Sequence, residues 1–399
     1  MTDTEPETRH HRQSARFLWL YALAAAGGAV AYVPFLTILL PERVAGFAGD
    51  EAVTVLAYAA FSGAIAASFA NIGFGWISDR TRARRPWIAV GLALSGILLV
   101  AMRNVDSLAI LIPLLVCWQV ALNMMLAPLS AWAGDRVPDE QKGMLGGLLA
   151  FAPALGALSG AIVTSPGLAD ADTRLLLVAG MVAVMVLPVL LLGDPRPMPE
   201  LMRDPEPVGE DIRTERRDPV ARMWFARLLV QIAEAALFAF LLVWFRSIDA
   251  SVTDNFTARI FSFVLGASVP VALFAGRWSD RTGKPVPPLI LGAGFGAAGL
   301  AVMALAPDME TGIAGYVLFG LATSIFLALH SSQTLRVLPK PSTRGRDLGF
   351  FNLTNTVPSL IMPWLTLALV PVFGFDALFW LLATLCAVAC TLLLSIRKI

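Results

Sequence analysis

Long, almost uninterrupted apolar runs restrict the fold of this chain more than any other feature of its sequence. Each run contains about 20 mainly apolar residues, the length that a helix needs to cross the hydrocarbon core of a bilayer. A membrane β-barrel would instead show segments of about ten residues with alternating polarity. We therefore predict an all-α membrane protein with twelve transmembrane helices, at residues 17–40, 52–77, 87–102, 107–132, 143–164, 174–193, 221–245, 257–277, 286–306, 311–335, 348–371 and 374–396.

The charge composition agrees with this fold class and excludes several functions. Only 15% of the 399 residues are charged, whereas soluble domains have about 25%. The 30 basic and 29 acidic side chains balance, so there is no basic excess for nucleic-acid binding. The sequence has no phosphate-binding Gly-x-x-x-x-Gly-Lys-Ser/Thr motif and no His or Cys cluster at metal-ligand spacing. We therefore expect no enzyme, no cofactor, no metal site and no nucleic-acid partner.

The distribution of Lys and Arg predicts the orientation, because cytoplasmic loops of membrane proteins are enriched in both. With a cytoplasmic N-terminus, the inner segments hold 24 of the 30 basic residues, the outer loops hold five, and Arg227 lies inside a span. Both termini are therefore expected in the cytoplasm, with the chain in the cell membrane. Residues 194–220 are rich in proline and charge. We predict that they form a cytoplasmic linker between two six-helix halves, 1–193 and 221–399.

Two cytoplasmic hairpins carry the same short sequence. The string Ser-Asp-Arg-Thr follows the second span at 78–81 and the eighth span at 279–282, an offset of 201 residues. A second match, Arg-Val-Pro at 136–138 against Arg-Val-Leu-Pro at 336–339, follows the fourth and tenth spans at an offset of 200. Two matches in equivalent positions indicate that the halves are pseudo-symmetric parallel repeats, related by an axis along the membrane normal.

The pattern Gly-x-x-x-Asp-Arg-x-Gly-Lys, complete at 276–284, resembles the signature loop of the Major Facilitator Superfamily. The resemblance covers nearly the whole chain and implies the major facilitator fold, in which these loops hold the cytoplasmic ends of the two halves together. Asp79 and Asp280 can accept hydrogen bonds from a helix N-terminus, and the arginines can form ion pairs that break when the gate opens. In a simpler interpretation, both loops only supply positive charge for topology. The resemblance assigns a gating role to Gly75, Asp79, Arg80, Arg84, Gly276, Asp280, Arg281 and Lys284.

Three longer strings carry a narrower resemblance. Residues 78–88, 126–143 and 335–363 are similar to the glycoside–pentoside–hexuronide cation symporters and the sucrose-transporter group. That resemblance implies uptake of a sugar or glycoside together with a proton or a sodium ion. Ala67 and Asn71 stand where the cation symporters carry an aspartate pair, which argues against sodium coupling through that site. We therefore expect the proton to be the coupling ion.

The seventh span holds the deep ionisable residues. Arg227, Gln231 and Glu234 are spaced to form one stripe on a helix, and Glu234 lies about 18 Å along it from Arg222, near the midplane. Charges at that depth are costly and usually face a cavity or a partner. Because burial favours the neutral form of a carboxyl group, Glu234 is the candidate proton carrier. Arg227 could keep that carboxyl ionised or bind substrate, or the two could simply pair and stiffen the helix.

Other polar residues within the spans are candidates for proton transfer or substrate binding. His330, in the inner half of the tenth span, could relay protons or could be a neutral packing residue. Gln119 and Asn123 share one face of the fourth span and could bind hydroxyl groups or a neighbouring helix. In the superfamily, spans one, four, seven and ten line the cavity. The resemblance therefore adds Tyr32, on the first span, to the candidates. The candidate substrate-binding residues are Gln119, Asn123, Gln231, Gln333 and Tyr32, whereas Asn71, Asn352 and Asn355 are expected to be gate or packing residues.

We expect a monomeric proton symporter that takes up a small organic solute, with a sugar or glycoside as the leading substrate class. An alternative is proton-driven efflux of an amphipathic drug or metabolite. Residues 152–157 on the fifth span resemble a degraded form of the Gly-Pro-x-x-Gly-Gly motif of drug:proton antiporters. The spacing from Gly156 to Gly160 also fits close helix packing. A further alternative is a membrane assembly protein of the same fold that transports nothing.

Overall fold

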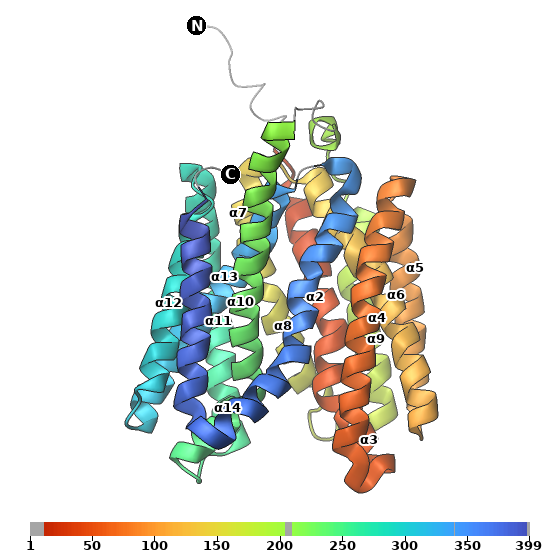
Figure 1. Ribbon diagram of the computed structural model, residues 1–399. Helices are drawn as coiled ribbons and strands as arrows, with labels where there is room; N and C mark the ends of the chain where they lie inside the picture. Colours follow the sequence, from red (N-terminus) through yellow and green to blue (C-terminus); the bar gives the residue numbers. More distant parts are fainter. Residues whose placement is uncertain (1–11, 204–209, 339, 397–399) are drawn as a thin grey trace, which may run out of the picture. The chain divides into compact units, whose positions relative to one another are not determined.

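The computed structural model describes residues 12–203, 210–338 and 340–396, and the regular secondary structure within these ranges is all helical (Figure 1). The elements from the N-terminal half of the sequence are α2 (Ala15–Pro34), η1 (Phe35–Leu39), α3 (Leu40–Ala48), η2 (Gly49–Glu51), α4 (Ala52–Thr81), α5 (Arg85–Ala101), η3 (Met102–Asn104), α6 (Leu108–Arg136), η4 (Asp139–Gln141), α7 (Lys142–Leu149), α8 (Phe151–Val163) and α9 (Ala171–Leu192). Those that follow are η5 (Pro199–Met202), α10 (Glu210–Ile248), α11 (Asp254–Thr282), α12 (Pro287–Ala304), α13 (Met309–Val337), η6 (Pro341–Thr343) and α14 (Arg344–Leu394).

The predicted fold class is confirmed. Among the described residues, eleven helical segments are long and apolar enough to cross a membrane, the last of them from Ala368 to Leu394. Gly374 divides α14 into two helices, because its φ of 77° and ψ of 177° lie outside helical geometry. A positive φ favours glycine, and the break falls at the first residue of the predicted span 374–396, shortly after the span 348–371. The part of α14 before Gly374 is the remaining predicted span.

Several helices continue beyond the predicted spans into polar sequence. α4 ends at Thr81 and α6 ends at Arg136, whereas the predicted spans end at 77 and 132, because the last turn of each helix is polar and does not continue the apolar run. The predicted linker, 194–220, contains η5 and the beginning of α10, which starts at Glu210. Residues 204–209 of this linker lie outside the described ranges, as do residues 1–11 and 397–399, which contribute to the basic-residue count behind the predicted orientation.

The chain forms two compact units. The first consists of Met1–Pro138, Phe151–Pro205 and Lys340–Leu353, and the second of Asp139–Ala150, Glu206–Pro339 and Thr354–Ile399. The two units differ from the predicted halves by two short segments. Residues 139–150, which hold α7, belong to the second unit, and residues 340–353, which hold the start of α14, belong to the first.

Equivalent helices pack in the same way within each unit. In the first unit α4 and α5 both pack against α6, and in the second α11 and α12 both pack against α13. Gly91 lets α5 approach the backbone of Met125 closely, and Gly292 lets α12 approach Phe326. Both pairs are related by the offset of 201 residues seen in the sequence, so the internal repeat extends into the packing.

Large apolar side chains remain exposed along the helices. Phe69, Leu191 and Phe274 are 74%, 76% and 73% exposed. Such exposure is unfavourable in water but suits a helix face that contacts lipid tails. The protein is therefore a multi-pass membrane protein.

Candidate functional site

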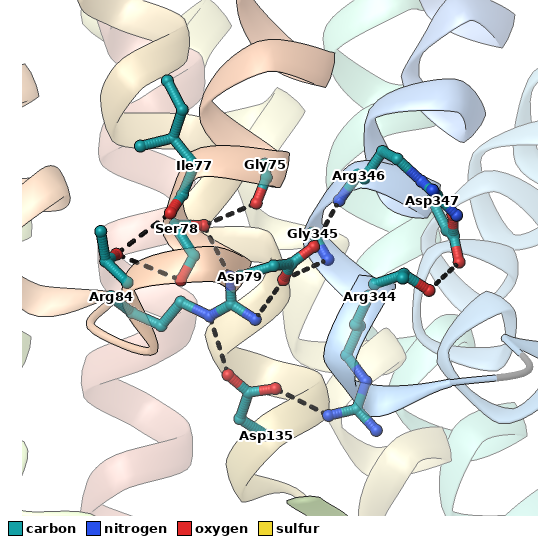
Figure 2. A network of polar contacts seen from close by, with 12 residues as sticks. Gly75, Ile77, Ser78, Asp79, Arg84, Asp135, Arg344, Gly345, Arg346 and Asp347 are labelled. Atoms are coloured by element: carbon teal, nitrogen blue, oxygen red, sulfur yellow. Dashed lines mark hydrogen bonds and ion pairs between the residues drawn. The ribbon is translucent and has the colours of Figure 1, made fainter. Parts of the chain in front are cut away.

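The first repeated loop places the carboxylate of Asp79 at the N-terminus of α14. Asp79 Oδ1 accepts a hydrogen bond from the Gly345 backbone nitrogen at 2.9 Å, and Oδ2 accepts one from Arg346 at 3.0 Å (Figure 2). The first backbone N–H groups of a helix have no intrahelical acceptor and carry partial positive charge. An aspartate at this position therefore supplies the missing acceptor and balances the partial positive charge.

A buried ionic network surrounds Asp79 in the first unit. Arg84 contacts Asp79 Oδ1 through Nη2 at 2.7 Å and Asp135 Oδ2 through Nε at 2.8 Å, while Arg344 contacts Asp135 Oδ1 at 2.7 Å (Figure 2). All four side chains are less than 10% exposed. Burial disfavours the charge of Arg84, but the carboxylates of Asp135 and Asp79 outweigh this effect and raise its pKa above the usual value.

The second repeated loop makes the equivalent contact in the second unit. Asp280 accepts hydrogen bonds at 2.7 Å from the backbone nitrogens of Gly143 and Met144, at the start of α7. Arg336 contacts Asp280 at 3.2 Å. The second unit thus repeats the helix-capping carboxylate, with Arg336 beside it.

The remaining loop residues fall into two groups. Gly75 and Gly276 have structural reasons to be glycine, because a Cβ atom on Gly75 would overlap the carbonyl oxygen of Gly345 and one on Gly276 would overlap that of Gly143. Arg80 lies over the ring of Trp76, with 5.5 Å from Cζ to the ring centroid. Arg281 and Lys284 are exposed and make no side-chain hydrogen bond or ion pair with the part of the chain that is described.

Sequence reasoning did not single out Asp135, Arg336 and Arg344 as partners of the loops. A signal was present, because Arg336 belongs to the repeated Arg-Val string and Asp135 directly precedes its first copy. Arg344 precedes the glycine that Asp79 caps. The predicted topology alone puts these residues near the loops, because all three lie at span ends that are predicted to be cytoplasmic.

A cavity of about 200 Å³ lies within the second unit, between α10, α11, α13 and α14. Its polar lining includes Glu234, Gln231 and Asn355, together with Tyr316, Thr323 and Ser324. Apolar side chains, among them Phe238, Phe261 and Phe319, form the rest of the wall. Glu234 makes no hydrogen bond or ion pair with the described residues. A carboxyl group thus lines a largely apolar cavity without a hydrogen-bond partner among the described residues.

Arg227 does not pair with Glu234. Its guanidinium instead contacts the carbonyl oxygen of Leu327 at 3.2 Å and the hydroxyl of Ser331 at 3.1 Å, both on α13. It also donates to Asn355 Oδ1 at 3.3 Å, and the same oxygen accepts a hydrogen bond from Gln231 Nε2 at 2.7 Å. Asn355, expected to be a gate or packing residue, therefore lies in the cavity wall with the predicted stripe of α10.

His330 and Gln333 are both fully buried on α13. His330 Nε2 lies 3.0 Å from the carbonyl oxygen of Met223 on α10, and its Nδ1 lies 3.1 Å from Thr334 Oγ1. The imidazole thus joins two helices beside Arg227, whose Nη1 is 3.5 Å from Nδ1. Neither amide atom of Gln333 has a hydrogen-bond partner in the described ranges, and neither residue lines the cavity of the second unit.

The polar candidates of the first unit bond mainly to one another. Asn71 donates to Asn123 Oδ1 at 2.8 Å, and Asn123 donates to the Gln119 carbonyl oxygen at 2.9 Å. All three are buried, whereas Tyr32 is 41% exposed. Asn123 thus has both ends of its amide engaged, one by α4 and the other by the preceding turn of α6. Over the described residues, no group of three or more His, Cys, Asp or Glu side chains is placed to hold a metal ion.

Comparison with known proteins gives consistent matches. The sequence profile of the Major Facilitator Superfamily matches residues 4–161 and 223–398. Two proteins from strains of Mycobacterium tuberculosis, both described as uncharacterized MFS-type transporters, are 28% identical over 316 residues, or 75% of this chain. The chain covers 66% of their length.

Solved structures share the fold at low sequence identity. The human organic anion transporter MFSD10 superimposes with a TM-score of 0.78 at 14% identity, over 95% of this chain and 99% of that one. A bacterial homologue of the iron transporter ferroportin, in its outward-facing state, gives 0.72 at 16% identity, over 95% and 98%. The proton:xylose symporter XylE gives 0.73 at 13% identity, over 96% of both chains. At such identities the similarity concerns the fold alone.

Proposed function

Since the chain belongs to the Major Facilitator Superfamily, we propose that it is a proton-coupled secondary transporter that moves a small organic solute by alternating access. We place it in the cell membrane with both termini in the cytoplasm, as the basic residues favour. The observation that carries the proposal is the carboxyl group of Glu234, which lines a membrane-embedded cavity without a partner among the described residues.

Glu234 is suited to carry the proton. An ionised carboxylate near the midplane costs from about 2.5 kcal/mol upward, and protonation removes that cost. Because the Glu234 carboxyl group lines the cavity, it can be reached by a solute bound there. Solute binding can therefore depend on whether Glu234 is protonated. His330, whose two ring nitrogens contact Met223 and Thr334, is assigned the role of positioning Arg227 instead of carrying protons.

The loop contacts are assigned to gating. Asp79 and Asp280 each cap a helix through two backbone N–H groups, and we propose that these bonds break and re-form during the transport cycle. Charge-assisted hydrogen bonds are strong enough to hold one state and can be replaced by water in another. Arg281 and Lys284, which are exposed, are assigned only to topology.

The leading substrate class is a sugar or glycoside taken up with a proton. The strings at 78–88, 126–143 and 335–363 support this class through their resemblance to sugar symporters. Amide groups of Gln231 and Asn355 in the cavity wall are suited to hydroxyl groups. Tyr32, Gln119 and Asn123 of the first unit stay candidates for the same role.

Efflux of an amphipathic compound is the second candidate. The specific observation in its favour is the apolar, aromatic part of the cavity wall at Phe238, Phe261 and Phe319. The degraded antiporter motif adds little, because Gly156 packs closely on Ala29 and Val33, as expected of a helix-packing glycine.

Reconstituted proteoliposomes test the proposal. Sugars, phenyl glycosides and amphipathic amines would be screened for accumulation driven by an imposed pH gradient. Glu234→Gln should abolish accumulation, because the neutral amide cannot exchange a proton. Glu51→Gln, the same change at an exposed position, should preserve it. If the Glu234 variant still accumulates solute against its gradient, the coupling assignment is wrong.

A further inference from the structure

Among the described residues, the hydrogen-bonding partners of the Arg227 guanidinium are all neutral groups. Its guanidinium contacts a carbonyl oxygen, a hydroxyl group, the imidazole of His330 and the amide of Asn355. No carboxylate of the described residues lies within ion-pair distance. Because a charge within a membrane span that has no directly paired carboxylate is costly, this arrangement favours binding of an anion at the guanidinium.

The side-chain oxygen of Asn355 marks where such an anion could bind. It accepts hydrogen bonds from Gln231 Nε2 at 2.7 Å and from Arg227 Nη2 at 3.3 Å. Gln231 and Asn355 line the cavity. A carboxylate oxygen in the same position would accept the same two hydrogen bonds and add charge, which roughly doubles their strength. The side-chain oxygen of Asn355 thus lies where an oxygen of a bound carboxylate group would accept the same two hydrogen bonds.

The charges around the cavity connect anion binding to the proton. On α10, Glu234 and Arg227 are seven residues apart, about 10 Å along the helix. From α13, Tyr316 lines the cavity and His330 stands behind Arg227, while the lining residues of α11 and α14 are uncharged. With Glu234 ionised, an anion would be the second negative charge beside one arginine. Protonation of Glu234 leaves one anion facing one cation.

We propose that the substrate is a small organic anion with a carboxylate head group, which binds at Arg227 and Gln231 in place of Asn355 and is bound together with a proton on Glu234. Its apolar or aromatic body would lie against Phe238, Phe261 and Phe319, on the same cavity wall. This inference rests on the proposed proton-coupled transport, and it narrows the substrate from any small organic solute to an anion. An acidic sugar derivative and a simple aryl carboxylate both belong to this substrate class.

Three ligands of the same shape test the charge preference. Phenylacetate, 2-phenylethanol and 2-phenylethylamine carry the same ring with an anionic, a neutral and a cationic head group. Isothermal titration of the full-length protein should show phenylacetate binding about 10-fold or more tighter than 2-phenylethanol, as expected for a hydrogen bond to a charged group. Titration in two buffers of different ionisation enthalpy should show uptake of about one proton per anion. Tighter binding of the amine, equal binding of the alcohol, or no binding of any of the three would overturn the proposal.

Two substitutions at one position sharpen the test. Asn355→Asp places a carboxylate beside Arg227 and should weaken phenylacetate binding at least about 10-fold. Asn355→Ala removes the competing acceptor and should strengthen it. Arg227→Gln should remove the preference of anion over alcohol, and binding of 2-phenylethanol reports that each variant has kept its cavity. Weakening by Asn355→Ala as large as that by Asn355→Asp would contradict the assigned anion position.

The two proposals fail in different ways. If a neutral sugar accumulates under a pH gradient through Glu234 while phenylacetate shows no advantage over the alcohol, the anion inference is wrong and the transport function stands. If phenylacetate binds selectively at Arg227 but no solute responds to a pH gradient, proton-coupled transport is wrong.

Discussion

Arg344 and Asp135, which are 209 residues apart in sequence, form a buried ion pair of 2.7 Å in the first compact unit. Arg84 contacts the other oxygen of the same carboxylate at 2.8 Å. One acidic side chain therefore satisfies two arginines, each less than 10% exposed. Asp135 is thus the centre of the network that surrounds the capped N-terminus of α14.

Removal of that carboxylate should destabilise the protein strongly. Asp135→Asn leaves Arg344 with a neutral partner and Arg84 with Asp79 as its remaining carboxylate, and breaking a buried pair costs about 3–5 kcal/mol. Thermal unfolding of the purified protein should show a clear fall in Tm. Asp347→Asn is the matched control, because Asp347 pairs with Arg346, whose side chain is 42% exposed. An equal Tm for both variants would contradict the central role of Asp135.

The two helix-capping aspartates should differ in their importance. Asp79 serves two backbone N–H groups and Arg84, which also depends on Asp135. Asp280 serves two backbone N–H groups and Arg336, at a longer 3.2 Å. Asp79→Asn should therefore lower Tm more than Asp280→Asn, by roughly 1–2 kcal/mol of apparent stability. Thermal unfolding of the two variants side by side measures the difference, and the reverse order would be inconsistent with the shorter ion pair of Asp79.

The sequence was sufficient to predict the spans and the two capping aspartates, because each depends on local signals. Apolar runs define helices that must satisfy their own backbone groups in lipid, and the repeated Ser-Asp-Arg-Thr string identifies equivalent positions in the two repeats. Even the break in α14 at Gly374 coincides with the start of the last predicted span. These features do not depend on which helices are neighbours.

The partners of the deep residues could not be predicted in the same way. Arg227 and Glu234 share a stripe on α10, but Arg227 contacts α13 and Asn355 instead of Glu234. That choice depends on the approach of α13 and α14, which helical periodicity does not describe. The same limit applies to Asp135 and Arg344, whose pairing depends on a contact across more than two hundred residues.

Gly276 should tolerate no larger side chain, because a Cβ atom would overlap the carbonyl oxygen of Gly143 at the crossing of α11 with α7. Gly276→Ala should therefore lower Tm, by about 1–3 kcal/mol of apparent stability as expected for overpacking. Gly266→Ala on the same helix is the control, since nothing lies within 4 Å of its Cβ position. There the higher helix propensity of alanine should leave Tm unchanged or raise it. Equal losses in both variants would contradict the close crossing.

Asp308 should contribute pH-dependent stability at the start of α13. Its carboxylate accepts a hydrogen bond from the Thr311 backbone nitrogen at 2.8 Å, and the hydrogen bonds from Thr311 lower its pKa below the usual value. Because the folded pKa is lowered, the contribution is present above the unfolded pKa of about 4 and is lost as pH falls through the folded value. Asp308→Ala should lower Tm at neutral pH, and its deficit against the unsubstituted protein should shrink below about pH 4. A deficit that stays constant into acid would argue against the ionised cap.

His330 should be needed for stability and not for proton coupling. Its two ring nitrogens lie 3.0 Å from the Met223 carbonyl oxygen and 3.1 Å from Thr334 Oγ1, so the imidazole connects α10 with α13 beside Arg227. His330→Leu should lower the apparent stability by about 1–3 kcal/mol, because leucine has no donor and the buried Met223 carbonyl group loses its hydrogen bond. In proteoliposomes the same variant should still accumulate solute under a pH gradient, whereas Glu234→Gln should not. A His330 variant that retains its Tm but loses the response to the gradient would instead make the imidazole a proton relay.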